Sequence, residues 1–228
     1  MKLNTFLATI LLSFLFALPG LAQVGEQRHN FAMGINGGIN LNSVSFSPTV
    51  RQSNLMGING GFSARYISEI YFKMICGAQI EVNFSQHGWK EFYEDYPELQ
   101  YTRKMTYVEI PFMAHLAFGK ERGVQGFFHA GPQIGFFLGD SHTQSGNWEN
   151  YTNLVVEQHE KAVENKFDYG ITAGAGLEIR TKAGNFMVEG RYYYALSDFY
   201  QSTKKDYFSR SAHGVISAKI TYLFDITK

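Results

Sequence analysis

At 228 residues the chain is long enough for one domain and barely long enough for two. Its 20 Lys and Arg residues balance its 20 Asp and Glu residues. This balance argues against nucleic acid as a partner, because binding phosphates requires a basic surface. Cys76 is the only cysteine, which excludes an intramolecular disulfide bond and a metal site built from cysteines.

The first residues have the features of an export signal. Lys2 supplies a basic start, an apolar stretch runs from Leu3 to Leu18, and small residues precede a cleavage site after Ala22. We therefore expect a signal peptide over residues 1–22 and one mature domain over residues 23–228; an uncleaved membrane anchor is the alternative. No later apolar run reaches the about 18 residues of a transmembrane helix, so a membrane-spanning chain would have to be a closed β-barrel.

Beyond the signal, apolar and polar residues alternate in eight segments, a pattern typical of strands with one apolar face. In the first segment Met33, Ile35 and Ile39 share one face, and Asn36 and Asn40 share the other. The segments cover residues 31–41, 56–66, 72–85, 107–118, 125–138, 167–180, 185–194 and 212–224. Each reaches the roughly 9–11 residues that a tilted strand needs to cross a bilayer.

The connections between these segments alternate in length. They cover residues 42–55, 67–71, 87–100, 119–123, 139–166, 181–184 and 197–210. Outer-membrane barrels combine short periplasmic turns with long extracellular loops in this way. We therefore predict an all-β fold, an eight-stranded antiparallel up-and-down transmembrane β-barrel with both kinds of connection. A short helix would fit within residues 151–166 of the third long loop.

The apolar face of each strand is predicted to touch lipid. The other face is rich in Gly, Asn, Gln, Ser and Thr and carries only about one or two charges per strand, whereas a surface in water normally carries more Lys and Glu. Phe84, Phe136 and Phe224 lie near strand ends on the apolar face, as in interfacial aromatic girdles. Both features favour an outer-membrane barrel over a soluble, lipocalin-like barrel, whose apolar face would point inward.

With this orientation, several charged residues point into the lumen. An eight-stranded barrel has an interior just wide enough to be filled by side chains, and unpaired charge there would be costly. We therefore expect a structural polar network of Arg65, Glu81, Glu109, His129, Glu178, Arg180, Glu189, Arg191 and Lys219, with Lys73 on the same inward face. A narrow ion path is the alternative.

We expect no catalytic, cofactor-binding or metal site. His115 and His129 lie on the polar faces of neighbouring segments and are placed to approach each other. No nucleophile accompanies them, so two hydrogen-bonded lumen histidines are favoured over a hydrolase. Trp89 and Trp148 fall in predicted extracellular loops, where packing of the loop is favoured over anchoring of a partner.

Four segments carry a resemblance to a known family. They are residues 107–115 (YVEIPFMAH), 127–136 (FFHAGPQIGF), 168–179 (DYGITAGAGLEI) and 189–196 (EGRYYYAL), with Ala195 where glycine is usual. In this order they resemble strands of the PorT-type outer-membrane β-barrel family. The resemblance implies eight antiparallel strands in the outer membrane, and one family member is tied to protein secretion across that membrane. The shared motifs would lie in the wall and lumen, so they imply fold rather than activity.

Together these features predict a non-enzymatic integral protein of the bacterial outer membrane. It would anchor its loops or support protein secretion or envelope assembly. Its partners would be outer-membrane lipid and envelope or secretion-complex proteins. The alternatives are a narrow channel for small solutes or ions and a lipid-modifying hydrolase at the rim of the barrel.

Overall fold

The protein is described by a computed structural model covering residues 25–120, 123–148, 154, 156–159 and 161–227. The predicted signal peptide, residues 1–22, lies outside these described residues. The strands of the described part are β1 (Glu26–Ser47), β2 (Gln52–Ser53), β3 (Leu55–Tyr71), β4 (Met74–Phe92), β5 (Gln100–Gly119), β6 (Gly123–Ser145), β7 (Phe167–Thr181), β8 (Gly184–Ala195) and β9 (Arg210–Asp225). None of the described residues belongs to a helix with the length and apolar character needed to span a membrane.

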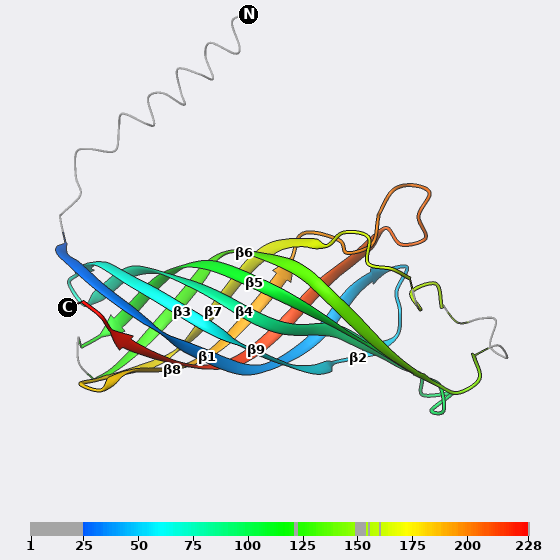
Figure 1. The fold of residues 1–228 in the computed structure, drawn as a ribbon, viewed down its shortest axis with the longest axis horizontal. Helices are drawn as coiled ribbons and strands as arrows, with labels where there is room; N and C mark the ends of the chain where they lie inside the picture. Colours follow the sequence, from blue (N-terminus) through cyan, green and yellow to red (C-terminus); the bar gives the residue numbers. More distant parts are fainter. Residues whose placement is uncertain (1–24, 121–122, 149–153, 155, 160, 228) are drawn as a thin grey trace, which may run out of the picture.

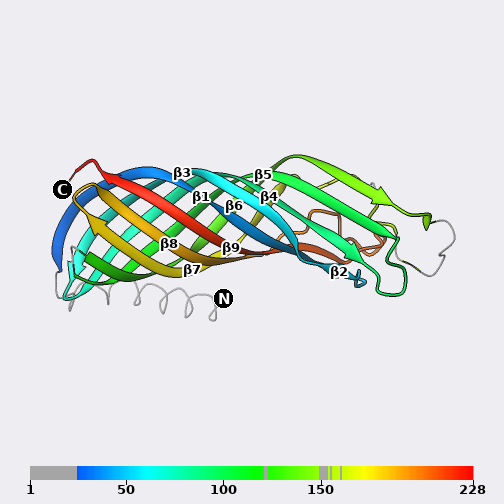
Figure 2. The ribbon, with the colours of Figure 1, turned by 90° about the horizontal axis from the view of Figure 1, so that it is seen from below.

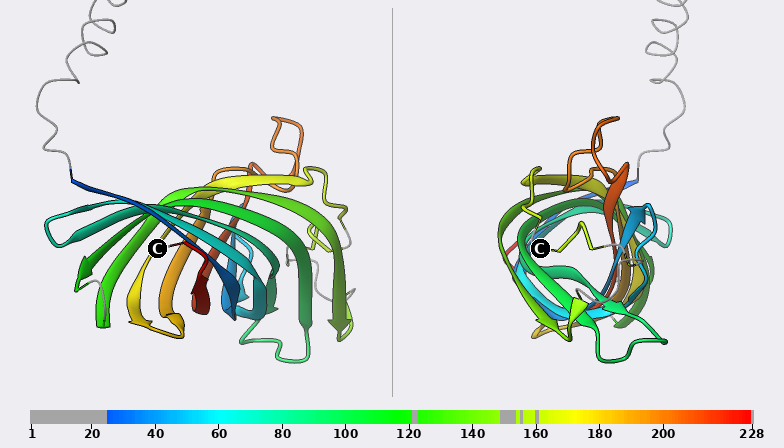
Figure 3. Two further views of the ribbon diagram at one scale, coloured as in Figure 1. Left: turned by 60° about the vertical axis from the view of Figure 1, so that its left-hand side comes forward. Right: turned by 90° about the vertical axis from the view of Figure 1, so that its right-hand side faces the viewer.

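The eight long strands close into a barrel (Figures 1 and 2). Each pairs antiparallel with its neighbours along the chain, and β1 pairs with β9 to complete the ring, which Figure 3 shows end-on. The two-residue strand β2 pairs with the outer end of β4. A closed ring satisfies its backbone hydrogen bonds within itself, which lipid requires. The prediction of an eight-stranded antiparallel barrel is confirmed.

Side chains along β8 show how the alternation sorts residues between the two faces of the wall. Phe186, Val188 and Tyr192 are exposed on the outside, whereas Met187 and Glu189 are buried inside. Other large apolar side chains exposed on the long strands are Met33, Ile35, Ile39, Ile58, Phe62, Ile80, Val82, Phe112, Phe128, Ile171, Leu177, Ile216 and Ile220. The apolar face therefore points outward, where lipid would cover it.

The connections keep the predicted alternation in length. At the end where β1 begins and β9 ends, the strands are joined by residues 72–73, 120–122 and 182–183. At the opposite end they are joined by residues 48–54, 93–99, 146–166 and 196–209. The first set corresponds to the periplasmic turns and the second to the extracellular loops.

The predicted bounds of three extracellular loops, 42–55, 87–100 and 139–166, and of the turn 67–71 are wrong, because the strands continue into them; β6 runs to Ser145 and β3 runs to Tyr71. β1 runs to Ser47 and β4 runs to Phe92. In these outer parts the character of the two faces is exchanged: Val44 and Trp89 are buried inside the barrel, whereas the outward neighbour Ser45 is polar and exposed. Above the lipid, water touches the outside of the wall and apolar residues fill the inside.

Two smaller predictions also differ from the structure where it describes the residues concerned. Lys73 lies exposed in the turn between β3 and β4 and does not point into the lumen, because the strand ends before it. The short helix predicted within residues 151–166 is absent from the part of that segment that the structure describes, residues 154, 156–159 and 161–166, and the rest of the segment lies outside the described residues. The side chains of Gln158 and Val163 are instead buried in the mouth of the barrel.

Candidate functional site

Polar side chains of the inner wall fill the middle of the barrel. Among the predicted network residues, Arg65, Glu81, Glu109, His129, Glu178, Glu189, Arg191 and Lys219 are buried, and Arg180 is half-buried. Charges removed from water in this way are stable only if each has a partner. The partners come from strands on several sides of the ring, so the network joins the wall across the lumen.

Arg65 on β3 and Glu178 on β7 form a two-point ion pair. The Arg65 Nη1 donates to Glu178 Oε2 at 2.7 Å, and Nη2 donates to Oε1 at 2.8 Å. Both side chains are only 1% exposed. Arg180 stands beside the pair, with its Nε 3.6 Å from Glu178 Oε1. Because the planar guanidinium matches a carboxylate at two points, this pair fixes distance and orientation between opposite strands.

Arg191 on β8 connects two carboxylates. Its Nη1 and Nη2 donate to the two oxygens of Glu81 at 2.9 Å each. Its Nε and Nη2 donate to Glu189 at 3.0 Å and 2.8 Å. The ammonium of Lys219 on β9 donates to Glu81 Oε2 at 2.7 Å. Two positive and two negative groups thus balance each other within this part of the network.

The two histidines on neighbouring strands are brought together, as expected. His115 Nδ1 lies 2.8 Å from His129 Nε2, and His129 Nδ1 lies 3.1 Å from Glu189 Oε1. Both rings are at most 1% exposed. They therefore continue the hydrogen-bond chain of Arg191 inside the barrel and lie far below its rim. Together with the Arg65 pair, these residues form what we call the ion-pair layer.

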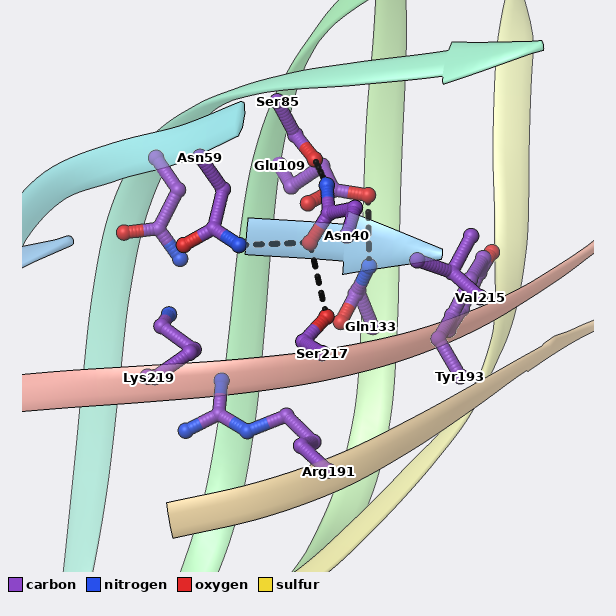
Figure 4. A pocket seen from close by; sticks show the side chains of 11 residues that line it. Asn40, Asn59, Ser85, Glu109, Gln133, Arg191, Tyr193, Val215, Ser217 and Lys219 are labelled. Atoms are coloured by element: carbon purple, nitrogen blue, oxygen red, sulfur yellow. Dashed lines mark hydrogen bonds between the residues drawn. The ribbon is translucent and has the colours of Figure 1, made fainter. Parts of the chain in front are cut away.

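A layer of amides and hydroxyls lies above the ion-pair layer, and Figure 4 shows part of it. Asn40 Nδ2 donates to Ser85 Oγ at 2.9 Å, and Ser217 Oγ donates to Asn40 Oδ1 at 2.8 Å. Gln133 Nε2 donates to Glu109 Oε1 at 2.9 Å. The cavity among these side chains measures about 20 Å³, which is room for about one water molecule. The layer is therefore nearly filled by its own side chains.

Histidine and tyrosine side chains form the next layer outward. His87 Nε2 lies 2.8 Å from Glu109 Oε1, and the Tyr107 hydroxyl lies 3.1 Å from His213 Nε2. The Tyr193 hydroxyl donates to Asp168 Oδ2 at 2.8 Å. His87 and His213 pack edge to face, with ring centroids 4.9 Å apart. The polar part of the lumen thus ends in a ring of aromatic side chains.

Apolar clusters lie at both ends of the polar part. The base cluster, on the side of the short turns, consists of Ala32, Ile67, Ile75, Ala117, Phe127, Met187 and Leu223, with Ile70 packed against it. The lid cluster, on the loop side, consists of Val44, Phe46, Val50, Trp89, Tyr101, Met105, Tyr107, Val163, Phe199, Tyr200 and Phe208, with Phe137 and Trp148 packed against it. Residues of three extracellular loops contribute to the lid cluster, so these loops fold inward over the mouth.

Polar contacts hold the third loop in the mouth. The Glu91 carboxylate accepts hydrogen bonds from the indole of Trp89 at 3.1 Å and from Gln158 Nε2 at 2.9 Å. His159 Nε2 lies 2.9 Å from the other carboxylate oxygen. The Tyr200 hydroxyl donates to the Gln158 carbonyl at 3.2 Å. Burial raises the pKa of Tyr200, so its hydroxyl stays protonated and able to donate. Trp89 lies in β4 and in the lid cluster, whereas the sequence analysis predicted it to lie in an extracellular loop.

A shallow hollow lies on the outside of the rim. It is lined by Glu164, Asn165, Lys166, Phe167, Tyr169, Leu196, Ser197, Asp198 and Ser202. Its acidic groups already have partners: Glu164 accepts from the Gln201 N–H at 2.7 Å, and Asp198 accepts from the Ser211 N–H at 2.6 Å. We therefore interpret the hollow as an irregular surface between two loops and not as a binding site.

Sequence reasoning missed the uncharged members of the lumen layers, notably Asn40, Gln133, His87 and His213. The signal was present, because Asn40 and Gln133 stand on the polar faces of predicted strands. His87 and His213 were harder to place, since one lay in a predicted loop. Among the described residues no group of three or more His, Cys, Asp or Glu side chains is arranged to hold a metal ion.

A family model and several solved structures are similar to this chain. A family model described as outer membrane protein beta-barrel domain matches residues 21–201. Neisserial surface protein A is similar in fold at 15% identity, covering 85% of this chain and 99% of its own, with a TM-score of 0.42. The outer membrane protein OprG from Pseudomonas aeruginosa is similar at 9% identity, covering 88% and 98%, with a TM-score of 0.45.

Ail, the attachment invasion locus protein of Yersinia pestis, is similar at 15% identity, covering 87% of this chain and 99% of its own, with a TM-score of 0.38. At such identities a likeness concerns the fold alone. No curated protein matches the chain.

Proposed function

The chain belongs to the outer membrane protein beta-barrel domain family and is a protein of the bacterial outer membrane, and from this premise we propose that it is a non-conducting, non-enzymatic barrel. In this proposal the barrel anchors its outer strand ends and loops at the cell surface, where they meet other proteins. The fold supplies a rigid support in the membrane, and the extracellular side supplies the contacts.

The observation that carries the proposal is the filling of the lumen. The base cluster, the ion-pair layer, the amide layer and the lid cluster follow one another, and the cavity between them holds about 20 Å³. A conducting pore needs a continuous aqueous path, and a barrel of eight strands is just wide enough for its own side chains. Two-point ion pairs such as Arg65–Glu178 favour a fixed interior over a mobile one.

The burial of His115 and His129 supports the non-enzymatic part of the proposal. A hydrolase acting on lipid needs its base and nucleophile at the rim, within reach of the substrate. Here both rings are held within the ion-pair layer by each other and by Glu189, and the lid cluster lies between them and the extracellular side. We assign them a structural role.

We further propose that the protein is of the PorT type and supports protein secretion or envelope assembly. The four segments that resemble that family form parts of β5, β6, β7 and β8. These segments supply Glu109, His129, Glu178 and Arg191, which all belong to the lumen layers. The likeness is thus concentrated in the residues that keep the barrel closed, which suits a support better than a conduit.

Single-channel recording in planar lipid bilayers tests the closed lumen. The full chain, folded and reconstituted, is expected to produce no stable current steps at moderate voltage, whereas a porin inserted under the same conditions serves as the positive control. Reproducible unitary currents from the wild-type protein would contradict the proposal and favour the narrow channel. A matched variant, Trp89→Ala, opens only the lid cluster and is expected to remain silent, because the layers below are unchanged.

A further inference from the structure

The three short turns at the periplasmic end of the barrel share one feature. The turn between β3 and β4 is Phe72-Lys73, the turn between β7 and β8 starts at Lys182, and the turn between β5 and β6 starts at Lys120. All three lysines are exposed. Residues 121–122 are one Glu and one Arg, so the sequence gives each turn a formal charge of +1. In Figure 1 the turns lie at the left-hand end of the barrel, near the start of β1 and the end of β9.

Three described carboxylates near this end belong to strands and not to the turns. Glu26 Oε1 lies 3.0 Å from Arg28 Nη2. Asp225 Oδ1 accepts a hydrogen bond from Asn185 Nδ2 at 2.8 Å. Glu69 is half-buried on β3. The lysines at the turns are therefore the charges that stand furthest toward the periplasm on these hairpins.

Aromatic side chains accompany the lysines on the outside of the wall. Phe72, which precedes Lys73, is 82% exposed. At the turn between β7 and β8, Phe186 packs against Tyr222 with ring centroids 4.9 Å apart, and the Tyr222 hydroxyl donates to the Ala183 carbonyl at 2.6 Å. Aromatic rings favour the level of the lipid headgroups, and a lysine beside them can hold its ammonium group in water while its stem lies on apolar surface. The turns thus combine the two residue types of a membrane interface.

Phe72 is unfavourable for the protein taken alone. Its φ is 56°, and no other residue except glycine has a positive φ in the part of the chain that the structure describes. Glycine or asparagine adopts this conformation at a lower cost. The ring packs edge to face on Tyr71 with centroids 4.9 Å apart, but most of its surface stays uncovered. A strained residue with an uncovered apolar side chain indicates a contact with something outside the protein.

We propose that the short turns bind anionic phospholipids of the periplasmic leaflet, with Phe72 seated among the headgroups and with Lys73, Lys120 and Lys182 each beside a lipid phosphate. This inference goes beyond the proposed function, because it holds whether or not the lumen conducts. Neighbouring turns are two strand spacings apart, which is about 10 Å. One small anion cannot reach all three lysines, whereas a leaflet presents many phosphates in one plane around the barrel.

The acidic peptides of the cell wall are a second anionic surface on the periplasmic side. They would meet the turns from the water and would leave the ring of Phe72 uncovered. The Phe186–Tyr222 pair on the outside of the wall would likewise gain nothing from them. A lipid leaflet covers these rings and neutralises the lysines at the same time, so the aromatic side chains favour lipid over the cell wall.

Quenching of tryptophan fluorescence by brominated lipids tests the contact at Phe72. The full chain with Phe72→Trp is placed in phosphatidylcholine nanodiscs that contain equal fractions of either brominated phosphatidylglycerol or brominated phosphatidylcholine, with bromine near the glycerol end of the chains. The signal of Trp89 and Trp148, measured in the wild type, is subtracted. Phosphatidylglycerol is expected to occupy the site about fivefold more often than phosphatidylcholine, which is the effect of one lysine near an anionic surface. Absence of quenching by both lipids would overturn the inference.

Two lysine variants in the Phe72→Trp background show whether the contact is local. Lys73→Gln is expected to bring the preference for phosphatidylglycerol close to one. Lys182→Gln is the matched control, because its turn lies four strands away, on the opposite side of the ring, and it is expected to keep the fivefold preference. A preference that survives Lys73→Gln, or that falls equally in both variants, would refute binding of a headgroup at this turn.

Unfolding from lipid vesicles tests the contribution of the turns together. Replacing part of the phosphatidylcholine by phosphatidylglycerol is expected to raise the folding equilibrium constant of the wild type. The double variant Lys73→Gln with Lys182→Gln is expected to lose about twenty-five-fold of that gain, fivefold for each lysine. The control, Lys204→Gln with Lys205→Gln in the extracellular loop between β8 and β9, changes the net charge equally and is expected to keep the gain; an equal loss in both would contradict the inference.

Soluble acidic peptides from the cell wall test the other occupant. Added to the nanodiscs, they are expected to leave the phosphatidylglycerol preference of the Phe72→Trp protein unchanged. Competition that abolishes this preference would assign the turns to the cell wall and overturn the choice of lipid.

Discussion

The Arg65–Glu178 pair allows a quantitative test of the filled lumen. The variant Arg65→Met keeps much of the side-chain volume and removes two hydrogen bonds of 2.7 Å and 2.8 Å. It leaves the Glu178 carboxylate 1% exposed, with Arg180 at 3.6 Å as the nearest remaining cation. Removing one partner of a buried pair costs about 3–5 kcal/mol, whereas replacing both by apolar residues is often nearly neutral.

We therefore expect Arg65→Met to lower the free energy of unfolding by about 3–5 kcal/mol, and we expect the double variant Arg65→Met with Glu178→Leu to recover most of that loss. Urea unfolding from lipid vesicles, followed by tryptophan fluorescence and by the heat-dependent gel shift of folded barrels, measures both. An Arg65→Met variant within about 1 kcal/mol of the wild type would refute the reasoning. So would a double variant whose loss equals the sum of the losses of Arg65→Met and Glu178→Leu measured singly.

Three further outcomes follow from the wall and the lid cluster. Ile220→Arg, on the lipid-facing side of β9, is expected to destabilise the folded barrel by about 2–4 kcal/mol, whereas Ile226→Arg, beyond the end of that strand, is expected to cost at most about 1 kcal/mol. Equal losses of unfolding free energy in lipid vesicles would contradict the placement of Ile220 within the lipid and of Ile226 outside it. Trp89→Ala is expected to cost about 3–5 kcal/mol and to speed protease cleavage of the extracellular loops, and unchanged cleavage would argue against a lid held by packing. Gly88→Ala is expected to destabilise the barrel by about 1–3 kcal/mol and so to lower the midpoint of thermal unfolding. The reason is that Gly88 has a φ of 133° and that an added methyl group would lie 1.9 Å from the Arg103 carbonyl oxygen. A midpoint equal to that of the wild type would refute this prediction.

The sequence predicts the membrane-embedded wall well, because lipid imposes one rule on every strand there. In β8, Phe186 and Val188 point outward and Glu189 points inward, as the alternation requires. The same rule misleads above the lipid, where Val44 and Trp89 are apolar and yet point inward. The period of two continues through β1 and β4, but the chemical meaning of each face changes, so strand ends cannot be read from polarity alone.

Membership of the lumen network was readable from the sequence, but its pairing was not. Arg65 and Glu178 stand 113 positions apart in the chain, and only the stagger of a closed ring decides that they meet. His87 and His213 depend on the same closure.

The apolar clusters at the two ends of the lumen determine how the interior responds to dissolved salt. Raising ionic strength from about 0.1 M to about 1 M shortens the screening length from about 10 Å to about 3 Å and weakens charge pairs on a surface. In the closed lumen that we propose, these clusters leave mobile ions no route to Arg191 and Glu81, so the attraction between the two side chains is expected to be the same at high and at low salt. A barrel sealed in this way keeps its internal electrostatics independent of the medium outside the cell.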